Sequence, residues 1–170
     1  MAIREVLRYP HPSLKRECRP LGRDDADELA RVAADLIDTM RAHPRCVGLA
    51  APQIDELVRM IVVDVTDHPK ATSCQGLMVL VNPRIVRASG AELGREGCLS
   101  IPELTGNVTR ATDIVVEALT PENSEYVLES SGFEARCLQH EIDHLDGVLF
   151  LDRVAALRTD VFPRKSYGSS

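Results

Sequence analysis

The chain has 170 residues, of which 44% are hydrophobic and only 4% aromatic, and its formal net charge is −6. That length suits one domain with an aliphatic core, and the negative charge opposes sequence-independent binding to nucleic acid, which requires a basic face. No apolar run approaches the ~20 residues of a membrane span, and the first residues lead into no signal-peptide hydrophobic region. We therefore expect no membrane association and no direct nucleic-acid binding.

The cysteines indicate a reducing compartment. There are five of them, an odd number, and their spacings form no obvious disulfide framework. Free thiols are the normal state of cysteine in the cytosol. We therefore expect a cytoplasmic protein.

The N-terminal third is predicted to be a loop followed by an amphipathic helix. Pro10, Pro12 and Pro20 favour a loop, because each proline fixes φ and removes a backbone donor. After an acidic start at residues 24–27, apolar residues recur at helical intervals until His43-Pro44, where the helix should end. The apolar positions are Leu29, Val32, Ala33, Leu36, Ile37 and Met40.

The middle of the chain is predicted to be β-rich. Runs of β-branched and aliphatic residues occur at 60–65, 77–81 and 113–119. No helical pattern lies between them, so antiparallel strands are favoured over βαβ units. Turns are expected at Asn82-Pro83, Ser89-Gly90 and Pro121-Glu122-Asn123.

The C-terminal part is predicted to hold a second helix, from near Ser130-Ser131 to just before Gly147, followed by a strand or extended segment at 148–151. We expect residues 1–170 to form a single catalytic domain, with 151–170 as a partly flexible tail. The cations of this tail fit a solvated end better than a docking patch. They are Arg153, Arg158, Arg164 and Lys165.

The second helix contains His140-Glu141-Ile142-Asp143-His144, a pattern typical of a metal site that hydrolyses amides. Two histidines four residues apart project from one helical face and can bind one divalent ion. The adjacent glutamate can accept a proton from a water on that ion. The fold class predicted is thus α+β, with antiparallel β-sheets around a central metal-binding helix and an N-terminal amphipathic helix.

A catalytic ion of this kind usually has three protein ligands, so one more is needed. Phe150 stands where an extended motif would place a third histidine, and no glutamate follows Glu141, so the ligand should lie upstream. Cys137 shares the helical face of the histidines, although a buried structural cysteine is the commoner role. Spacing alone leaves Cys137 and Cys98 open. The full set of upstream candidates is Cys18, Cys46, Cys74, Cys98, Cys137, His11, His43 and His68.

Three segments together resemble the peptide deformylase family, and the resemblance runs from about the first ten residues to about Arg153. They are Gly48-Leu49-Ala50-Ala51-Pro52-Gln53, Glu96-Gly97-Cys98-Leu99-Ser100, and residues 139–147 around the two histidines. Each motif alone is a moderate signal, whereas all three in this order are a strong one.

The resemblance implies a ligand set and a reaction. Cys98, His140 and His144 would hold the metal, Glu141 would be the general base and acid, and Gln53 with the backbone N–H of Leu99 would stabilise the oxyanion. Hydroxide on the metal would attack the formyl carbon of an N-terminal formylmethionine and release formate. Expected partners are N-formylmethionyl nascent peptides, with a possible transient ribosome contact.

A thiolate ligand suits Fe(II), Zn(II), Ni(II) or Co(II) and disfavours Mg(II) and Ca(II). The family resemblance implies one divalent ion per chain, with Fe(II) as the native ion.

The expected substrate-binding residues lie around this site. Val47 and Gly48 belong to a segment that can pair with an extended peptide, although small residues there can instead serve close backbone packing. The others are Gly97, Phe133, Arg136 and Cys137. A flexible methionine side chain would occupy an apolar pocket beside the metal.

The sequence departs from the family pattern at three places. Cys46 replaces a glycine, which predicts a stiffer or oxidation-sensitive lip of the groove. Arg136 stands where relatives commonly carry an aliphatic residue, and it would either narrow the methionine pocket or lie along its rim. The short tail with Pro163 argues against a long terminal helix. Two alternatives to the deformylase function stay open. One is a metallopeptidase that carries the same helix motif, and the other is an inactive or substrate-restricted deformylase-like metal-binding protein.

Overall fold

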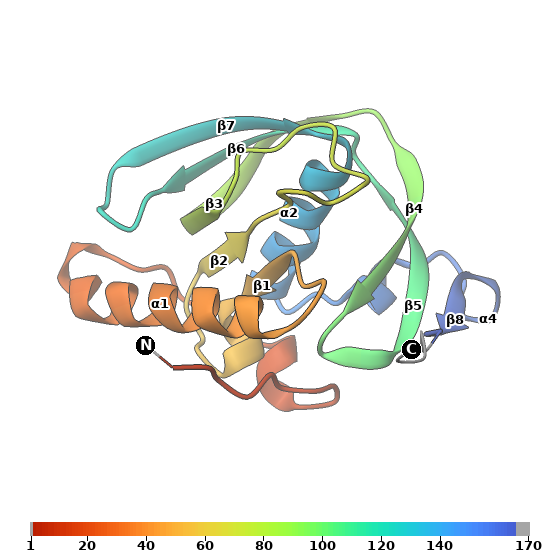
Figure 1. Ribbon diagram of the computed structural model, residues 1–170, viewed down its shortest axis with the longest axis horizontal. Coiled ribbons are helices and arrows are strands. Elements are labelled where there is room, and N and C mark those ends of the chain that lie inside the picture. The colour runs from red at the N-terminus through yellow and green to blue at the C-terminus, as the bar shows by residue number, and fades with distance from the viewer. Residues whose placement is uncertain (1, 166–170) are drawn as a thin grey trace.

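A computed structural model describes residues 2–165 of the chain (Figure 1). The helices are α1 (Ala26–Ala42), α2 (Gly132–Leu145), α3 (Phe150–Arg153) and α4 (Leu157–Asp160), with 3₁₀ turns at Pro12–Lys15, Arg23–Asp25 and Ala51–Ile54. The strands are β1 (Gly48–Ala50), β2 (Met60–Val63), β3 (Met78–Ser89), β4 (Glu92–Cys98), β5 (Ile101–Arg110), β6 (Asp113–Leu119), β7 (Glu125–Ser131) and β8 (Val161–Pro163). Among these described residues, no helix has the length and apolarity needed to cross a bilayer.

Two antiparallel sheets organise the molecule. The larger has the strand order β1-β2-β3-β6-β7, and the smaller has the order β4-β5-β8. In Figure 1, α2 runs between the larger sheet and the β4–β5 hairpin. This mixture of helices and antiparallel sheets is the fold predicted from the sequence.

β2 is buried on both of its faces, and this is why both long helices pack on the larger sheet. All four residues of β2 are buried, and they alternate between two cores: Ile61 and Val63 join the core beneath α2, whereas Met60 and Val62 join the core beneath α1. Side chains of a strand alternate between the faces of a sheet, so a continuous apolar run marks a strand covered on both sides. A third core lies under the smaller sheet and includes Phe150.

Several predicted boundaries are confirmed. The N-terminal helix ends at Ala42 with His43 as its C-cap, and α2 follows the N-cap Ser131. Gly147 has a φ of +70°, as expected for a left-handed residue just beyond a helix. β6 has the predicted bounds of 113–119, and a turn follows at Pro121.

Two local predictions are wrong. Asn82-Pro83 is no turn between strands but lies inside β3, at an irregularity in its pairing with β6; the Asn82 side chain bonds both the N–H and the carbonyl of Leu21. The strand or extended segment expected at 148–151 is wrong for its second half: Leu149 is extended, but helix α3 begins at Phe150. The Asp152 carboxylate accepts a hydrogen bond from the Leu149 N–H at 2.8 Å and so caps that helix.

The segment predicted as a partly flexible tail contains most of α3, then α4 and β8, and β8 pairs with β5 through Leu104↔Pro163 and Thr105↔Phe162. Residues 166–170 of that prediction lie outside the described residues.

Candidate metal centre

Three ligand-type side chains converge between α2 and the end of β4. Suitable atoms of Cys98, His140 and His144 all lie within 4.8 Å of one another, and all three residues are buried. The Sγ of Cys98 is 3.4 Å from the Nε2 of His144. Among the described residues, this is the one group of three or more cysteine, histidine or acidic side chains with such geometry.

The convergence follows from how the two elements are held together. Histidines four residues apart share one face of α2, and Cys98 is the last residue of β4, at an irregularity in its pairing with β5. Leu99 and Ser100 form the turn that links Cys98 to β5. The other helical candidate, Cys137, is buried but stays outside the group.

The Cys98 thiol is electrostatically suited to ionise. Burial alone would raise its pKa, but attraction to His144 and hydrogen bonding to both imidazoles lower the pKa well below the usual value. A thiolate is the form in which cysteine binds metals. The Cys137 thiol has the opposite environment, because burial and the nearby Glu141 raise its pKa.

Glu96 orients one of the two histidines. Its Oε1 accepts a hydrogen bond from the Nδ1 of His140 at 2.8 Å, which leaves Nε2 as the ring nitrogen that can bind a metal ion. Arg110 donates two hydrogen bonds to the same carboxylate, at 2.9 and 3.0 Å. Burial raises the pKa of Glu96, but His140 and Arg110 outweigh it and bring the pKa down to about 2.

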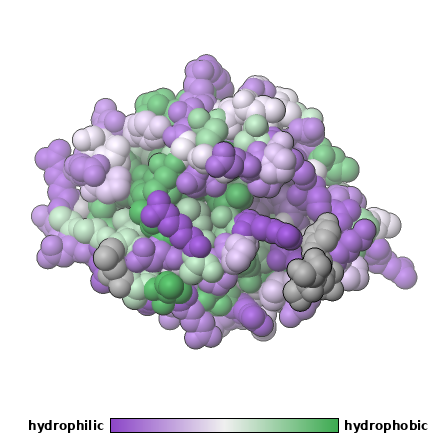
Figure 2. Space-filling model, in the orientation of Figure 1, coloured by the Kyte–Doolittle hydropathy of each residue, from purple (hydrophilic) through white to green (hydrophobic). Residues whose placement is uncertain are grey.

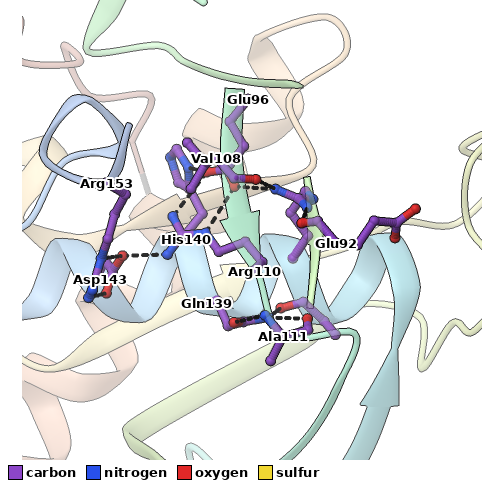
Figure 3. Close-up of polar contacts among 11 residues, drawn as sticks. Glu92, Glu96, Val108, Arg110, Ala111, Gln139, His140, Asp143 and Arg153 are labelled. Atoms are coloured by element: carbon purple, nitrogen blue, oxygen red, sulfur yellow. Dashed lines mark hydrogen bonds and ion pairs between the residues drawn. The ribbon is translucent and has the colours of Figure 1, made fainter. Parts of the chain in front are cut away.

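Glu96 is part of a larger network of ion pairs and hydrogen bonds (Figure 3). Arg110 also donates to Asp143 at 2.6 Å, and Arg153 from α3 closes on the same carboxylate at 2.9 Å. The side chain of Gln139 bonds the N–H and the carbonyl of Ala111, at 3.0 and 2.9 Å. These contacts fasten the ligand-bearing helix to β5 at several points.

Arg136 takes part in this network and does not extend freely into solvent. Its guanidinium donates to Glu96 at 2.8 Å and to the backbone carbonyls of Val108 and Glu92 at 2.8 and 2.7 Å. A Cβ at position 94 would lie 2.8 Å from the guanidinium carbon, so Gly94 provides the space that Arg136 fills. The fixed side chain borders the cleft described below.

Glu141 has the contrasting environment on the other side of α2. Its side chain is buried, and among the described residues its Oε2 has no hydrogen-bond partner. Burial raises its pKa. A Cβ on Gly48 would come within 2.8 Å of its Oε1, so the backbone of β1 approaches the carboxylate closely.

Gln53 is fixed beside the ligand group from the opposite wall. Its Oε1 accepts from the Ala50 N–H at 2.9 Å, and its Nε2 lies 3.3 Å from the Sγ of Cys98 and 3.1 Å from the Oγ of Ser100. The amide is thereby oriented with its donor nitrogen toward Cys98.

One cleft of about 1170 Å³ opens onto this group. Every site residue predicted from the sequence lines it except His144, which lies beneath in the ligand group. The predicted residues on its surface are Val47, Gly48, Gln53, Gly97, Cys98, Leu99, Phe133, Arg136, Cys137, His140 and Glu141. β1 is an edge strand of the larger sheet, and an edge strand is the kind of element to which an extended peptide can add.

Two of the upstream candidates have other contacts. His68 stacks on Phe133 with ring centroids 4.1 Å apart. Cys46 donates its thiol to the Gly48 carbonyl at 3.1 Å, and burial raises its pKa to about 12, which disfavours the reactive thiolate. The contact ties residue 46 to β1.

The sequence analysis assigned no role in the site to six residues: Arg110, Asp143, Arg153, Arg95, Phe162 and Arg164, of which the last three line the cleft. The first three are charged side chains that are held in place only by ion pairs with residues distant in the sequence. No local sequence pattern predicts such pairs. Glu96, Gln139 and Asp143 stood inside the quoted motifs, and their position next to the candidate metal ligands in the sequence was the available signal.

The fold and this site together define a hydrolase of the deformylase type. Residues 3–160 match the family model described as polypeptide deformylase. A peptide deformylase of Thermomicrobium roseum is 44% identical over 155 residues, covering 91% of this chain and 87% of the relative.

Solved structures give the same result. A peptide deformylase from Legionella pneumophila aligns with a TM-score of 0.82 at 38% identity, covering 92% of this chain and 89% of that one. A Met-Ala-Ser-bound class I type b enzyme from Acinetobacter baumannii aligns with a TM-score of 0.83 at 35% identity, covering 90% and 100%. The chain belongs to the peptide deformylase family.

Proposed function

We propose that this enzyme removes the formyl group from the N-terminal formylmethionine of newly synthesised polypeptides, and that Cys98, His140 and His144 hold its metal ion. The observation that carries the proposal is the convergence of these three buried side chains at the floor of the cleft that Glu141 and Gln53 also line. Membership of the family supports the reaction class.

The donor set fits one divalent transition metal. One thiolate and two imidazoles suit Fe(II), Zn(II), Ni(II) or Co(II), and we propose Fe(II) as the native ion. Three protein ligands are the usual number in a catalytic site with an open position. When bound, such an ion supplies Lewis acidity that makes a water nucleophilic near neutral pH and polarises a carbonyl.

Glu141 carries the protons in the proposed reaction. Hydrolysis adds water across the formyl C–N bond: oxygen joins the formyl carbon, the C–N bond breaks, and the amine nitrogen takes a proton as formate leaves. The Glu141 carboxylate accepts the proton of the attacking water and delivers it to that nitrogen. Its burial supports this role, because a raised pKa brings the carboxyl closer to neutral pH.

Gln53 and Leu99 are the proposed donors to the negative oxygen that develops on the formyl carbon. The orientation of the Gln53 amide toward Cys98 supports its part, and the backbone of Leu99 follows Cys98 directly in the turn after β4. A donor of this type typically contributes a factor of roughly 10²–10³ in rate.

The peptide would lie in the cleft along β1. Val47 and Gly48 would pair with its backbone, and Phe133 with Cys137 would provide apolar contacts for the methionine. The relative with bound Met-Ala-Ser supports a short peptide as the kind of ligand. Arg136 is held by hydrogen bonds to Glu96 and to two backbone carbonyls. These bonds support the alternative in which the arginine lies along the rim of the methionine pocket and does not close it.

The decisive experiment measures formate. Protein purified without oxygen and loaded with Fe(II) is incubated with formyl-Met-Ala-Ser and with unformylated Met-Ala-Ser. We expect formate and intact Met-Ala-Ser from the first peptide and no cleavage of the second. Cleavage of the unformylated peptide would instead establish a metallopeptidase. Metal binding without formate release, in wild type and in Arg136→Ala, would establish an inactive metal-binding relative.

The ligand assignment has a matched pair of variants. Cys98→Ala should abolish stoichiometric metal binding, because it removes one of three ligands, whereas Cys137→Ala should retain the metal and lose only packing. Elemental analysis of both proteins after dialysis measures this directly. The reverse result would assign the third ligand to the helix.

A further inference from the structure

The C-terminal strand builds one wall of the cleft. β8 pairs with β5, and the Arg164 N–H donates to the Glu103 carbonyl at 2.8 Å, so the chain after Pro163 is held beside β5. Phe162, Pro163, Arg164 and Lys165 all line the cleft. In Figure 1, β8 lies next to the lower end of β5, on the side of the molecule that holds the hairpin.

This wall is cationic. Arg95 of β4 stacks its guanidinium 3.8 Å from the ring centre of Phe162, and its hydrogen bonds go to the neutral side chains of Asn107 and Thr105. The guanidinium of Arg164 reaches the space that a side chain at Gly97 would fill. We call Arg95, Arg164 and Lys165 the cationic wall.

The charges of the wall are not neutralised within the described part of the chain. Arg95, Arg164 and Lys165 are exposed, and no ion pair of residues 2–165 involves them. The carboxylates that line the cleft are Glu96 and Glu141, and both are buried.

The mouth of the cleft is thus positive although the whole chain has a net charge of −6. Figure 2 shows hydrophilic residues around the hollowed part of this face, in the region where Figure 1 places β4 and β5.

We propose that the cationic wall binds the part of a formylated peptide beyond its methionine and favours acidic side chains there. This rests on the proposed function, because the wall borders the cleft that leads to the ligand group. Opposite charges at a partly exposed site attract modestly and are screened by salt. Because the cations line a cleft that opens onto the reaction site, a peptide is the occupant that they fit best.

The test compares two peptides that differ only in charge. Iron-loaded enzyme is assayed for formate release from formyl-Met-Glu-Glu and formyl-Met-Gln-Gln at low ionic strength. We expect kcat/KM to be about 3- to 20-fold higher for the acidic peptide, with the ratio falling toward one in about 0.5 M NaCl, where the Debye length is only several ångström. Equal values of kcat/KM at low salt would overturn the proposal.

Variants assign the preference to the wall. Arg95→Gln and Arg164→Gln should each lower the ratio of the two kcat/KM values, and Arg164→Lys should restore most of it because the charge is kept. Arg158→Gln is the matched control, since Arg158 is an exposed cation of the same C-terminal segment that does not line the cleft. A preference that survives both glutamine variants would remove the wall from recognition.

The outcomes separate this proposal from the proposed function. Formate release from both peptides without an acidic preference would overturn the wall's role and leave the deformylase reaction standing. Failure of the iron-loaded enzyme to release formate from either peptide would overturn both. Binding of a short RNA duplex that depends on Arg95 and Arg164, together with equal kcat/KM for the two peptides, would assign the wall to nucleic acid.

Discussion

The two sides of α2 place two buried glutamates in opposite environments. On the hairpin side, Glu96 accepts hydrogen bonds from Arg110, Arg136 and His140, and its pKa falls to about 2. On the side that faces β1, Glu141 keeps an oxygen without a partner among the described residues, and burial raises its pKa. The same type of side chain is thus a fixed anion in one region and, in the proposed reaction, a proton carrier in the other. Both glutamates are buried, so the difference between their pKa values comes from their hydrogen-bond partners more than from their burial.

Removing the proton carrier should give the largest effect on turnover. Glu141→Gln cannot accept a proton from water, so kcat should fall by roughly 10²–10⁴-fold. Metal content and the urea midpoint should stay close to wild type, because no hydrogen bond of the Glu141 carboxylate is lost among the described residues. Formate release and elemental analysis check both parts. Near wild-type turnover would remove Glu141 from the mechanism.

Removing the fixed anion should instead damage stability. Glu96→Gln leaves the buried Arg110 and Arg136 without their shared counter-charge, which typically costs about 3–5 kcal/mol. Replacement of the anionic partner of His140 by a neutral amide should also weaken metal binding, by up to about 10- to 100-fold. Urea unfolding of the metal-free protein and a competition assay with a chelator measure these.

Glu129→Gln is the control for that loss, because it breaks an exposed pair with Arg87 and should cost less than about 1 kcal/mol. Equal destabilisation by the two variants would contradict the distinction between a buried network and a surface pair.

Displacing the proton carrier without removing it should give an intermediate effect. Gly48→Ala puts a Cβ within 2.8–3.1 Å of three Glu141 atoms, so the carboxylate must move. A shift of about 1 Å can cost up to about 10²-fold, and we expect kcat to fall by roughly ten- to a hundredfold. Gly22→Ala is the control, since its Cβ would meet only Asp25 at 3.7 Å. Unchanged kcat in Gly48→Ala would mean that β1 does not set the position of Glu141.

An exposed carboxylate should give the smallest effect, and it provides a test by pH. Burial raises the pKa of Asp152, but hydrogen bonds from Lys15 and the Leu149 N–H outweigh it and lower the pKa below 3.8. A lowered folded pKa gives stability that is present above about pH 4 and lost as the pH falls through the folded value. Asp152→Asn should therefore cost at most about 1 kcal/mol at neutral pH, and less in acid. Urea midpoints near neutral pH and near pH 3 measure the difference, and a cost that grows in acid would contradict the sign.

The sequence predicted the elements whose signals are local. Helical periodicity located α1 and α2, the continuous run Met60–Val63 located β2, and Gly147 marked the end of the ligand-bearing helix. β4 was not predicted, because its polar residues Glu92, Arg95 and Glu96 show no apolar strand pattern. The turn predicted at Asn82-Pro83 failed because a tertiary contact with Leu21 holds Asn82 in an irregular strand.

The candidate site was also predicted only in part, because some of its residues have local sequence signals and others are placed by tertiary contacts. Spacing on one helix gave His140, Glu141 and His144, and the family resemblance gave Cys98 and Gln53; the structure brings all five together around one cleft, while their chemical roles remain proposals. The arrangement of Arg110 and Arg136 around Glu96 depends on the packing of β4, β5 and α2, which no spacing rule reveals. Charged residues belong on the surface by default, so buried ones escape local reasoning.

The contact between Gly94 and Arg136 constrains how this protein can change over evolutionary time. The arginine occupies volume that exists only because residue 94 lacks a side chain, and it joins β4, β5 and α2 through three hydrogen bonds. A bulkier residue at 94 is compatible with this packing only if residue 136 shortens first or at the same time. We therefore expect the two sites to be epistatic, so that lineages that differ at one also differ at the other.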